Sequence, residues 1–125
     1  MKEQKIAVIG MGMWGKNIVR NFYNLNVLEM VCDLDDESLK SVQEQFPGVK
    51  VTKDFNDIIN NPDITGVAVV TPSHTHFKIV KAMLEAGKNV YVEKPISTVA
   101  EEAKVLTELA ESKGLVLMVD HLLLY

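Results

Sequence analysis

The N-terminal 33 residues hold a pattern that few chain topologies can satisfy. A short apolar run, residues 5–9, leads directly into Gly10-Met11-Gly12-Met13-Trp14-Gly15, and a helix-patterned segment and a second apolar run ending at Asp33 follow. A strand, a G-x-G-x-x-G turn, a helix, a strand and a terminal acid describe the first half of a dinucleotide-binding α/β fold. The glycine motif alone is a weak signal, but in this context it is a strong one.

Each part of this pattern has a physical task. Gly10 allows a tight turn, Gly12 lets the backbone approach a pyrophosphate, and Gly15 lets the helix pack close to the strand. The N-terminus of that helix presents free N–H groups to the anion.

Asp33 lies eighteen residues after Gly15, at the carboxyl end of the second predicted strand. A carboxylate there can accept hydrogen bonds from both hydroxyls of the adenosine ribose, and its charge repels a 2′-phosphate. No Arg or Lys follows within residues 34–37 to receive such a phosphate. The sequence therefore predicts NAD as the cofactor, with NADP less favoured. The alternative is a surface acid in a turn.

Composition and charge narrow the class of protein. The 125 residues fit one domain, and 47% hydrophobic with 24% charged residues is usual for a soluble globular protein. The net charge of −4 comes without a basic patch, so nucleic acid and anionic membranes are poor partner hypotheses. The single cysteine, Cys32, excludes an internal disulfide and is interpreted as a buried structural thiol. With no room for a signal peptide before residue 5 and no membrane-spanning run, we expect a cytoplasmic protein.

The rest of the chain alternates strands and helices. Strands are expected at residues 5–9, 28–33, 49–52, 66–70, 89–92 and 115–119. This alternation predicts an α/β fold with a doubly wound parallel sheet of six strands in the order 3-2-1-4-5-6, a Rossmann fold. The ligand crevice should lie beyond the carboxyl ends of strands one and four. We also expect Leu25 to continue the apolar face of the first helix and Ser73 to cap the helix after the fourth strand.

The end of the chain indicates a domain boundary. Residues 1–120 are interpreted as a dinucleotide-binding domain, and residues 121–125 as the start of a connection to a C-terminal α+β substrate domain. The apolar tail, residues 120–125, has no predicted element to join.

Two loops at the predicted crevice carry chemical groups. Thr71 offers a hydroxyl and Pro72 stiffens the loop after the central strand. His74 and His76 could act on a substrate, or could cap the helix and lie on its solvent side. These histidines are too close together, and without partner ligands, to argue a metal site, so no metal is expected.

Glu93-Lys94-Pro95 ends the fifth predicted strand at the same sheet edge. The Lys94 ammonium can polarise a substrate oxygen or pass on its proton as hydride moves to a nicotinamide. An ordinary surface lysine in a turn is the alternative.

Taken together, these motifs resemble the N-terminal domain of the glucose–fructose oxidoreductase / inositol dehydrogenase / rhizopine-catabolism (Gfo/Idh/MocA) family. The resemblance is carried by the glycine motif with Asp33, by the Thr71-Pro72-x-x-x-His76 segment and by the Ala-Gly-Lys…Glu-Lys-Pro block at residues 86–95. It implies an NAD(P)-dependent oxidoreductase acting on a secondary hydroxyl of a sugar, cyclitol or nucleotide-sugar. The cofactor-binding residues it implies are Gly10, Gly12, Met13, Trp14, Gly15, Asp33, Thr71, Pro72, His76, Glu93, Lys94 and Pro95, with Lys94 also the catalytic residue.

The chain departs from the family pattern in two ways. Leu124 stands where many members have an arginine, which leaves the substrate open. Family members also continue into an α+β domain that supplies the catalytic Asp/His pair, most substrate contacts and the oligomer interface. We therefore expect this chain to bind NAD(H) without turning over alone, and the whole protein to be a homo-oligomer. The alternative is a non-catalytic nucleotide-binding or NADH-sensing module.

Overall fold

The computed structural model describes residues 4–10, 15–93, 100–119 and 122–123. Within these ranges the strands form one sheet in the order β3-β2-β1-β4-β5-β6-β7. The strands are β1 (Ile6–Ile9), β2 (Leu28–Cys32), β3 (Lys50–Thr52), β4 (Gly66–Val69), β5 (Asn89–Val92), β6 (Leu117–Val119) and β7 (Leu122–Leu123). Strands β1 to β6 pair in parallel, which confirms the predicted order of the six parallel strands.

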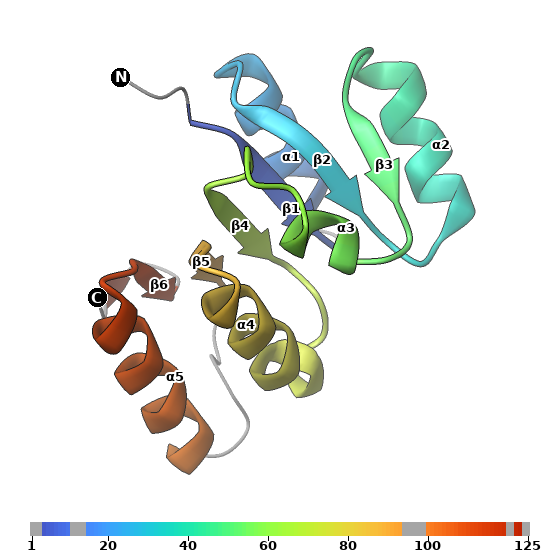
Figure 1. Ribbon diagram of the computed structural model, residues 1–125. Coiled ribbons are helices and arrows are strands. Elements are labelled where there is room, and N and C mark those ends of the chain that lie inside the picture. Colours follow the sequence, from blue (N-terminus) through green and yellow to red (C-terminus); the bar gives the residue numbers. More distant parts are fainter. Residues whose placement is uncertain (1–3, 11–14, 94–99, 120–121, 124–125) are drawn as a thin grey trace.

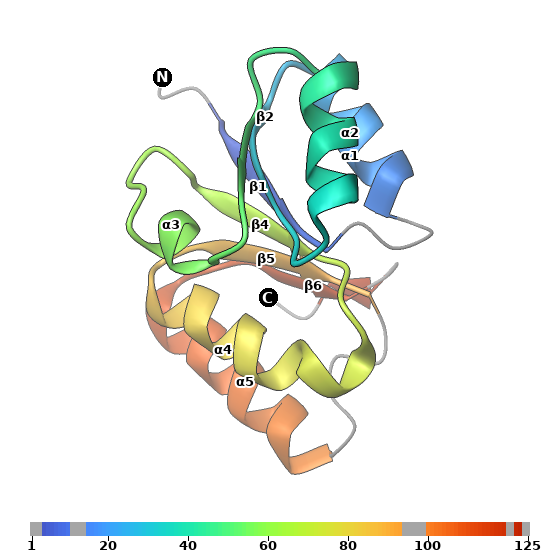
Figure 2. The ribbon, with the colours of Figure 1, turned by 90° about the vertical axis from the view of Figure 1, so that its right-hand side faces the viewer.

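Helices cover both faces of this sheet. They are α1 (Gly15–Asn24), α2 (Asp36–Gln45), α3 (Asn56–Ile59), α4 (His76–Glu85) and α5 (Ala100–Lys113), with a 3-10 turn, η1 (Ser73–Thr75), before α4. Figures 1 and 2 show α1 and α2 on one face, and α3, α4 and α5 on the other. Each face has its own buried cluster. Val19 of α1 and Val42 of α2 belong to one cluster, and Val80 of α4 and Leu106 of α5 belong to the other. The sheet is therefore doubly wound.

The central strand β4 reads Gly-Val-Ala-Val and is buried along its whole length. A parallel strand covered by helices on both faces has no solvated side, so its sequence is continuously apolar. In its pairing with β1, Ile9 lies opposite Val69, and Ile9 also lies opposite Cys32 of β2. The carboxyl ends of these three strands thus lie at one level, and the loops that follow them meet at one edge.

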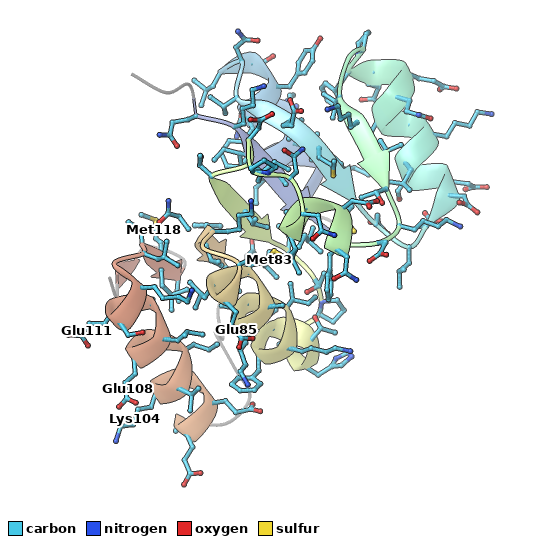
Figure 3. All side chains as sticks on the ribbon, in the orientation of Figure 1. Met83, Glu85, Lys104, Glu108, Glu111 and Met118 are labelled. Atoms are coloured by element: carbon cyan, nitrogen blue, oxygen red, sulfur yellow. The ribbon has the colours of Figure 1, made fainter. Side chains whose placement is uncertain are left out.

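The two faces of α5 explain how this helix packs. Leu106 and Ala110 are fully buried against the core. Lys104, Glu108 and Glu111 point away from α4 (Figure 3), and the Lys104 Nζ lies 3.9 Å from Glu108 Oε1 one turn along. An apolar stripe facing inward and a charged face outward is the pattern of a surface helix on a globular domain.

Two local expectations are wrong. Leu25 is 69% exposed, because α1 ends at Asn24 and the chain turns through Asn26 at a φ of 63°. Ser73 does not cap a helix, because it lies inside the 3-10 turn that precedes α4. Residues 98–101, Thr-Val-Ala-Glu, match the capping-box pattern that opens a helix, but residues 98 and 99 lie outside the described residues.

The apolar tail contributes a strand that the sequence pattern did not predict. Leu122 and Leu123 form β7, which pairs antiparallel with Val119 and Met118 of β6. An edge strand leaves a row of backbone groups unpaired, and β7 satisfies some of those of β6. Within the described ranges, no helix is both long and apolar enough to cross a membrane.

Candidate functional site

A groove of about 1010 Å³ lies at the carboxyl edge of the sheet. Cofactor and ligand sites occupy about 300–1,000 Å³, so the groove is large enough for at least one nucleotide of a dinucleotide. Its walls come from the segments that follow β1, β2, β3 and β4 and from the start of α4. The groove lies where the sequence predicts the crevice, beyond the ends of β1 and β4.

Gly10 closes the turn after β1 at the floor of this groove. Its φ is +98°, and its backbone N–H donates to the Cys32 carbonyl at 2.8 Å. A Cβ at this position would lie 2.8 Å from the Val70 carbonyl oxygen, which is closer than real Cβ atoms approach. Glycine is therefore required here both by backbone conformation and by the close crossing of the two loops.

Asp33 continues directly from β2 and lines the groove, half-buried. Its backbone N–H donates to the Thr52 carbonyl at 3.1 Å, and its Oδ1 accepts from the Asp35 backbone N–H at 2.9 Å. Among the described residues its Oδ2 has no hydrogen-bond partner. The next residue, Leu34, is 82% exposed and also lines the groove. The groove is thus lined by Asp33, whose Oδ2 can accept a hydrogen bond, and by the exposed apolar side chain of the next residue, Leu34.

The loop after β4 is held by a short chain of hydrogen bonds. The Thr71 and Thr75 hydroxyl oxygens lie 2.5 Å apart, and the Thr75 hydroxyl donates to the Pro72 carbonyl at 2.6 Å. His76 Nε2 donates to the Thr71 carbonyl at 2.8 Å. A carbonyl oxygen only accepts, so Nε2 carries a hydrogen. These hydrogen bonds from Thr75 and His76 therefore hold the loop that presents Thr71 and Pro72 to the groove.

The two histidines of this segment have different places. His76 is only 2% exposed, so it does not lie on the solvent side of α4, and it is not among the side chains that line the groove. His74 is exposed and does line the groove. His76 thus positions the loop, whereas His74 is accessible to a ligand.

Cys32 lies under the groove and is 4% exposed. Burial, followed by the nearby charge of Asp33, raises the pKa of its thiol to about 11. The thiol is neutral at pH 7, which makes it a poor nucleophile. The predicted burial of the Cys32 thiol is confirmed.

Sequence reasoning overlooked the contribution of the segment after β3. Lys53, Asp54 and Phe55 all line the groove. Lys53 Nζ lies 2.6 Å from Asp36 Oδ1, in the first turn of α2. The sequence carries a signal for Lys53, because this residue directly follows the third predicted strand and so lies at the ligand edge, outside residues 34–37.

Several predicted site residues cannot be placed. Gly12, Met13, Trp14, Lys94 and Pro95 lie outside the described residues. Gly15 begins α1, and Glu93 directly follows β5, half-buried.

Of the predicted set, the structure brings Gly10, Asp33, Thr71 and Pro72 together in one groove. Val92 is level with Val69 in the sheet, so Glu93 emerges at the same edge.

A doubly wound parallel sheet with a glycine turn after its first strand, an acid after its second and a groove between them defines a nucleotide-binding Rossmann domain. Residues 4–121 match the profile of the Gfo/Idh/MocA oxidoreductase family, described as an oxidoreductase family with an NAD-binding Rossmann fold. The chain belongs to this family and is its NAD(P)-binding domain.

Known relatives include cyclitol dehydrogenases. The chain is 34% identical over 119 residues to scyllo-inositol 2-dehydrogenase (NADP(+)) IolW of Bacillus subtilis, covering 94% of this chain and 33% of that protein. It is 34% identical to inositol 2-dehydrogenase of Rhodococcus erythropolis, covering 90% of this chain and 34% of that protein. The crystal structure of scyllo-inositol dehydrogenase from Lactobacillus casei, with bound NAD(H) and scyllo-inositol, superposes with a TM-score of 0.85 at 27% identity, covering 94% of this chain and 36% of that one. The chain thus spans about a third of the length of the curated relatives it matches.

Proposed function

We propose that this chain is the cofactor-binding domain of an NAD-dependent dehydrogenase that oxidises a secondary hydroxyl of a sugar, cyclitol or nucleotide-sugar. The observation that carries the proposal is the groove at the carboxyl edge of the sheet, where Gly10, Asp33 and Thr71 converge. The inositol dehydrogenases among the relatives support the substrate class.

The described residues fit a dinucleotide. Asp33 Oδ2 would accept a hydrogen bond from a ribose hydroxyl, and the exposed Leu34 side chain would cover one face of an adenine. Gly10 lets the loops after β1 and β4 approach each other closely, and the pyrophosphate would lie beside this turn. When bound, the nicotinamide supplies the hydride acceptor for alcohol oxidation. Thr71, Pro72 and Glu93 would face the groove toward that end, and Lys94 would hold or move the proton of the reacting hydroxyl.

The preference for NAD rests on charge. Asp33 and Asp35 line the groove, and Asp36 begins α2 beside them. A 2′-phosphate would meet these carboxylates, whereas a 2′-hydroxyl can donate to one of them. One relative is named as NADP(+)-dependent, so the family alone does not decide this point.

Direct titration tests the cofactor. NADH and NADPH are titrated into the protein, with binding followed by quenching of the single tryptophan, Trp14, in the glycine turn. We expect NADH to bind at least about tenfold tighter than NADPH. Asp33→Ala should weaken NADH binding by about tenfold or more, because it removes hydrogen bonds to the ribose. Tighter binding of NADPH than of NADH by the wild-type protein contradicts the assignment.

We further propose that a second, α+β domain completes the enzyme. The relatives are about three times as long as this chain, which supports a further domain that binds the substrate. The 125-residue chain should then bind NAD(H) but reduce no NAD when scyllo-inositol or myo-inositol is added. Robust NADH formation under these conditions contradicts this. NADH binding by a full-length protein that has no dehydrogenase activity on any polyol would favour an NADH-sensing module instead.

Self-association of the domain is part of the same proposal. Val116, directly before β6, and Met118, opposite Leu123 of β7, are 44% and 39% exposed. Burial of such side chains between two copies favours association. Light scattering should therefore show a concentration-dependent rise in mass, and a monomer at high concentration contradicts this prediction.

A further inference from the structure

Lys53 is placed beside Asp33 by the register of the sheet. Cys32 of β2 lies opposite Thr52 of β3, and the Asp33 N–H donates to the Thr52 carbonyl at 3.1 Å. Asp33 and Lys53 are therefore the next residues on two neighbouring parallel strands, and both line the groove. A second lysine, Lys78, also lines the groove but comes from α4 and not from the strand next to β2. Lys53 is thus the cation that the sheet itself brings to the carboxylate expected at the ribose.

The Lys53 ammonium forms an ion pair in this structure. Its Nζ lies 2.6 Å from Asp36 Oδ1, with the two side chains 52% and 80% exposed. It also contributes to the lowered pKa of Asp35, after the larger effect of the Ser38 hydrogen bonds, so its charge reaches the first turn of α2. An exposed ion pair contributes little to stability. Its effect here is to keep the Lys53 ammonium next to Asp36.

We propose that the Asp36–Lys53 ion pair is a second determinant of cofactor choice, which acts by holding the Lys53 ammonium on α2 and away from a 2′-phosphate. The proposal rests on the proposed function, since it concerns the adenosine end of the same site. A 2′-hydroxyl needs only the accepting oxygen of Asp33. A 2′-phosphate brings about two negative charges next to the Asp33 and Asp35 carboxylates, and Lys53 is already paired with Asp36. Removal of the Asp36 charge frees Lys53 to receive that phosphate.

The test compares two acids in the same helical turn. The dissociation constants of NADH and NADPH are measured for the wild-type protein, Asp36→Asn and Glu37→Gln. Both variants remove one negative charge from the first turn of α2, but in the structure only Asp36 is paired with Lys53. We expect Asp36→Asn to shift the ratio of the two constants toward NADPH by about tenfold, the size of one charge-assisted hydrogen bond, and Glu37→Gln by less than about threefold. Equal shifts in the two variants overturn the proposal, because net charge would then explain both.

A double variant identifies the cation. In Asp36→Asn/Lys53→Met the shift toward NADPH should disappear. The matched control, Asp36→Asn/Lys50→Met, removes a lysine whose Nζ lies 3.0 Å from Glu29 and which does not line the groove. This control should keep the shift, and raised salt should reduce it, because an exposed phosphate–ammonium contact is screened. A shift that survives the loss of Lys53 overturns the proposal.

The outcomes separate this inference from the proposed function. Wild-type protein that binds neither NADH nor NADPH contradicts the proposed function. Wild-type protein that binds NADH, combined with an Asp36→Asn ratio equal to that of the wild type, overturns only the role of the ion pair. Asp36→Ser serves as a second variant with the same expected shift. Matching far-ultraviolet circular dichroism of all variants ensures that the comparison concerns folded protein.

Discussion

Gly10 and Gly48 adopt the same left-handed backbone conformation in different surroundings. Their φ angles are +98° and +92°, but a Cβ at Gly10 would meet the Val70 carbonyl at 2.8 Å, whereas at Gly48 nothing lies within 4 Å. We expect Gly48→Ala to lower the free energy of unfolding by about 1 kcal/mol, the cost of the conformation alone. Gly10→Ala should cost about 2–4 kcal/mol, because the clash adds to it. Urea unfolding measures both, and equal losses would show that the crossing loops relax freely.

Lys88 is a buried cation at the opposite edge of the sheet, only 4% exposed. Its ammonium donates to the carbonyls of Asn61 at 2.6 Å and Ile64 at 2.7 Å, and so joins the segment before β4 to β5. Lys88→Met should lower the free energy of unfolding by about 2–4 kcal/mol, because buried acceptors lose their donor. The control is Lys113→Met, whose exposed ammonium donates to the Glu85 carbonyl at 3.1 Å and which should cost about 0.5 kcal/mol or less. Similar losses in thermal or urea unfolding would contradict the structural role of Lys88.

At the scale of elements, the start of α2 carries a titratable cap. The Asp35 carboxylate accepts from the Ser38 hydroxyl at 2.8 Å and from the Ser38 N–H at 3.3 Å. These bonds, the hydroxyl first, lower the pKa of Asp35 below its ordinary value of 3.8. The folded state thus favours the charged form. This stabilisation is present above the ordinary value and is lost as the pH falls through the lower pKa of the folded protein.

The pH dependence of this cap can be measured directly. In a nuclear magnetic resonance titration, the pKa of Asp35 should rise when Ser38 is replaced by alanine, because the largest cause of its lowering is removed. Urea unfolding between pH 5 and pH 2 should show a smaller acid-induced loss of stability for Asp35→Asn than for the wild-type protein. An Asp35 pKa unchanged in Ser38→Ala would contradict the assignment of the cap.

The elements themselves were largely predictable because they follow local rules. Continuous apolar runs located the parallel strands. Glycine with a positive φ is common just after a helix, and Gly87 and Gly114, at φ +81° and +66°, follow α4 and α5 in this way. The prediction for Leu25 was wrong because helical spacing of apolar residues does not reveal that α1 ends at Asn24, one residue before Leu25. The prediction for Ser73 was wrong because the hydrogen bond from the Thr75 hydroxyl to the Pro72 carbonyl favours a 3-10 turn over a capped helix start. Such choices depend on loop contacts that periodicity does not report.

At the scale of the whole molecule, strand order made the site predictable in outline. Once β1, β2 and β4 are adjacent and parallel, Gly10, Asp33 and Thr71 must meet at one edge. Lys53 directly follows the third predicted strand, which places it at the ligand edge, but its position beside Asp33 depends on the register between β2 and β3. The antiparallel strand β7 was not found, because two leucines carry no strand periodicity. Pairing across the sheet, and not local pattern, decided both.

The residues that line the groove follow four of the parallel strands, β1 to β4, so cofactor binding should stabilise the whole domain and not one loop. A ligand at about one hundred times its Kd adds about 2.7 kcal/mol to the free energy of unfolding. For a chain of this size that corresponds to a rise in Tm of about 10 °C. The rise should appear together in circular dichroism and in Trp14 fluorescence, as expected for one cooperative unit. Nicotinamide mononucleotide at the same concentration should raise Tm far less, because it lacks the adenosine half that Asp33 and Leu34 would hold. Equal shifts with both ligands would place the binding energy elsewhere in the groove.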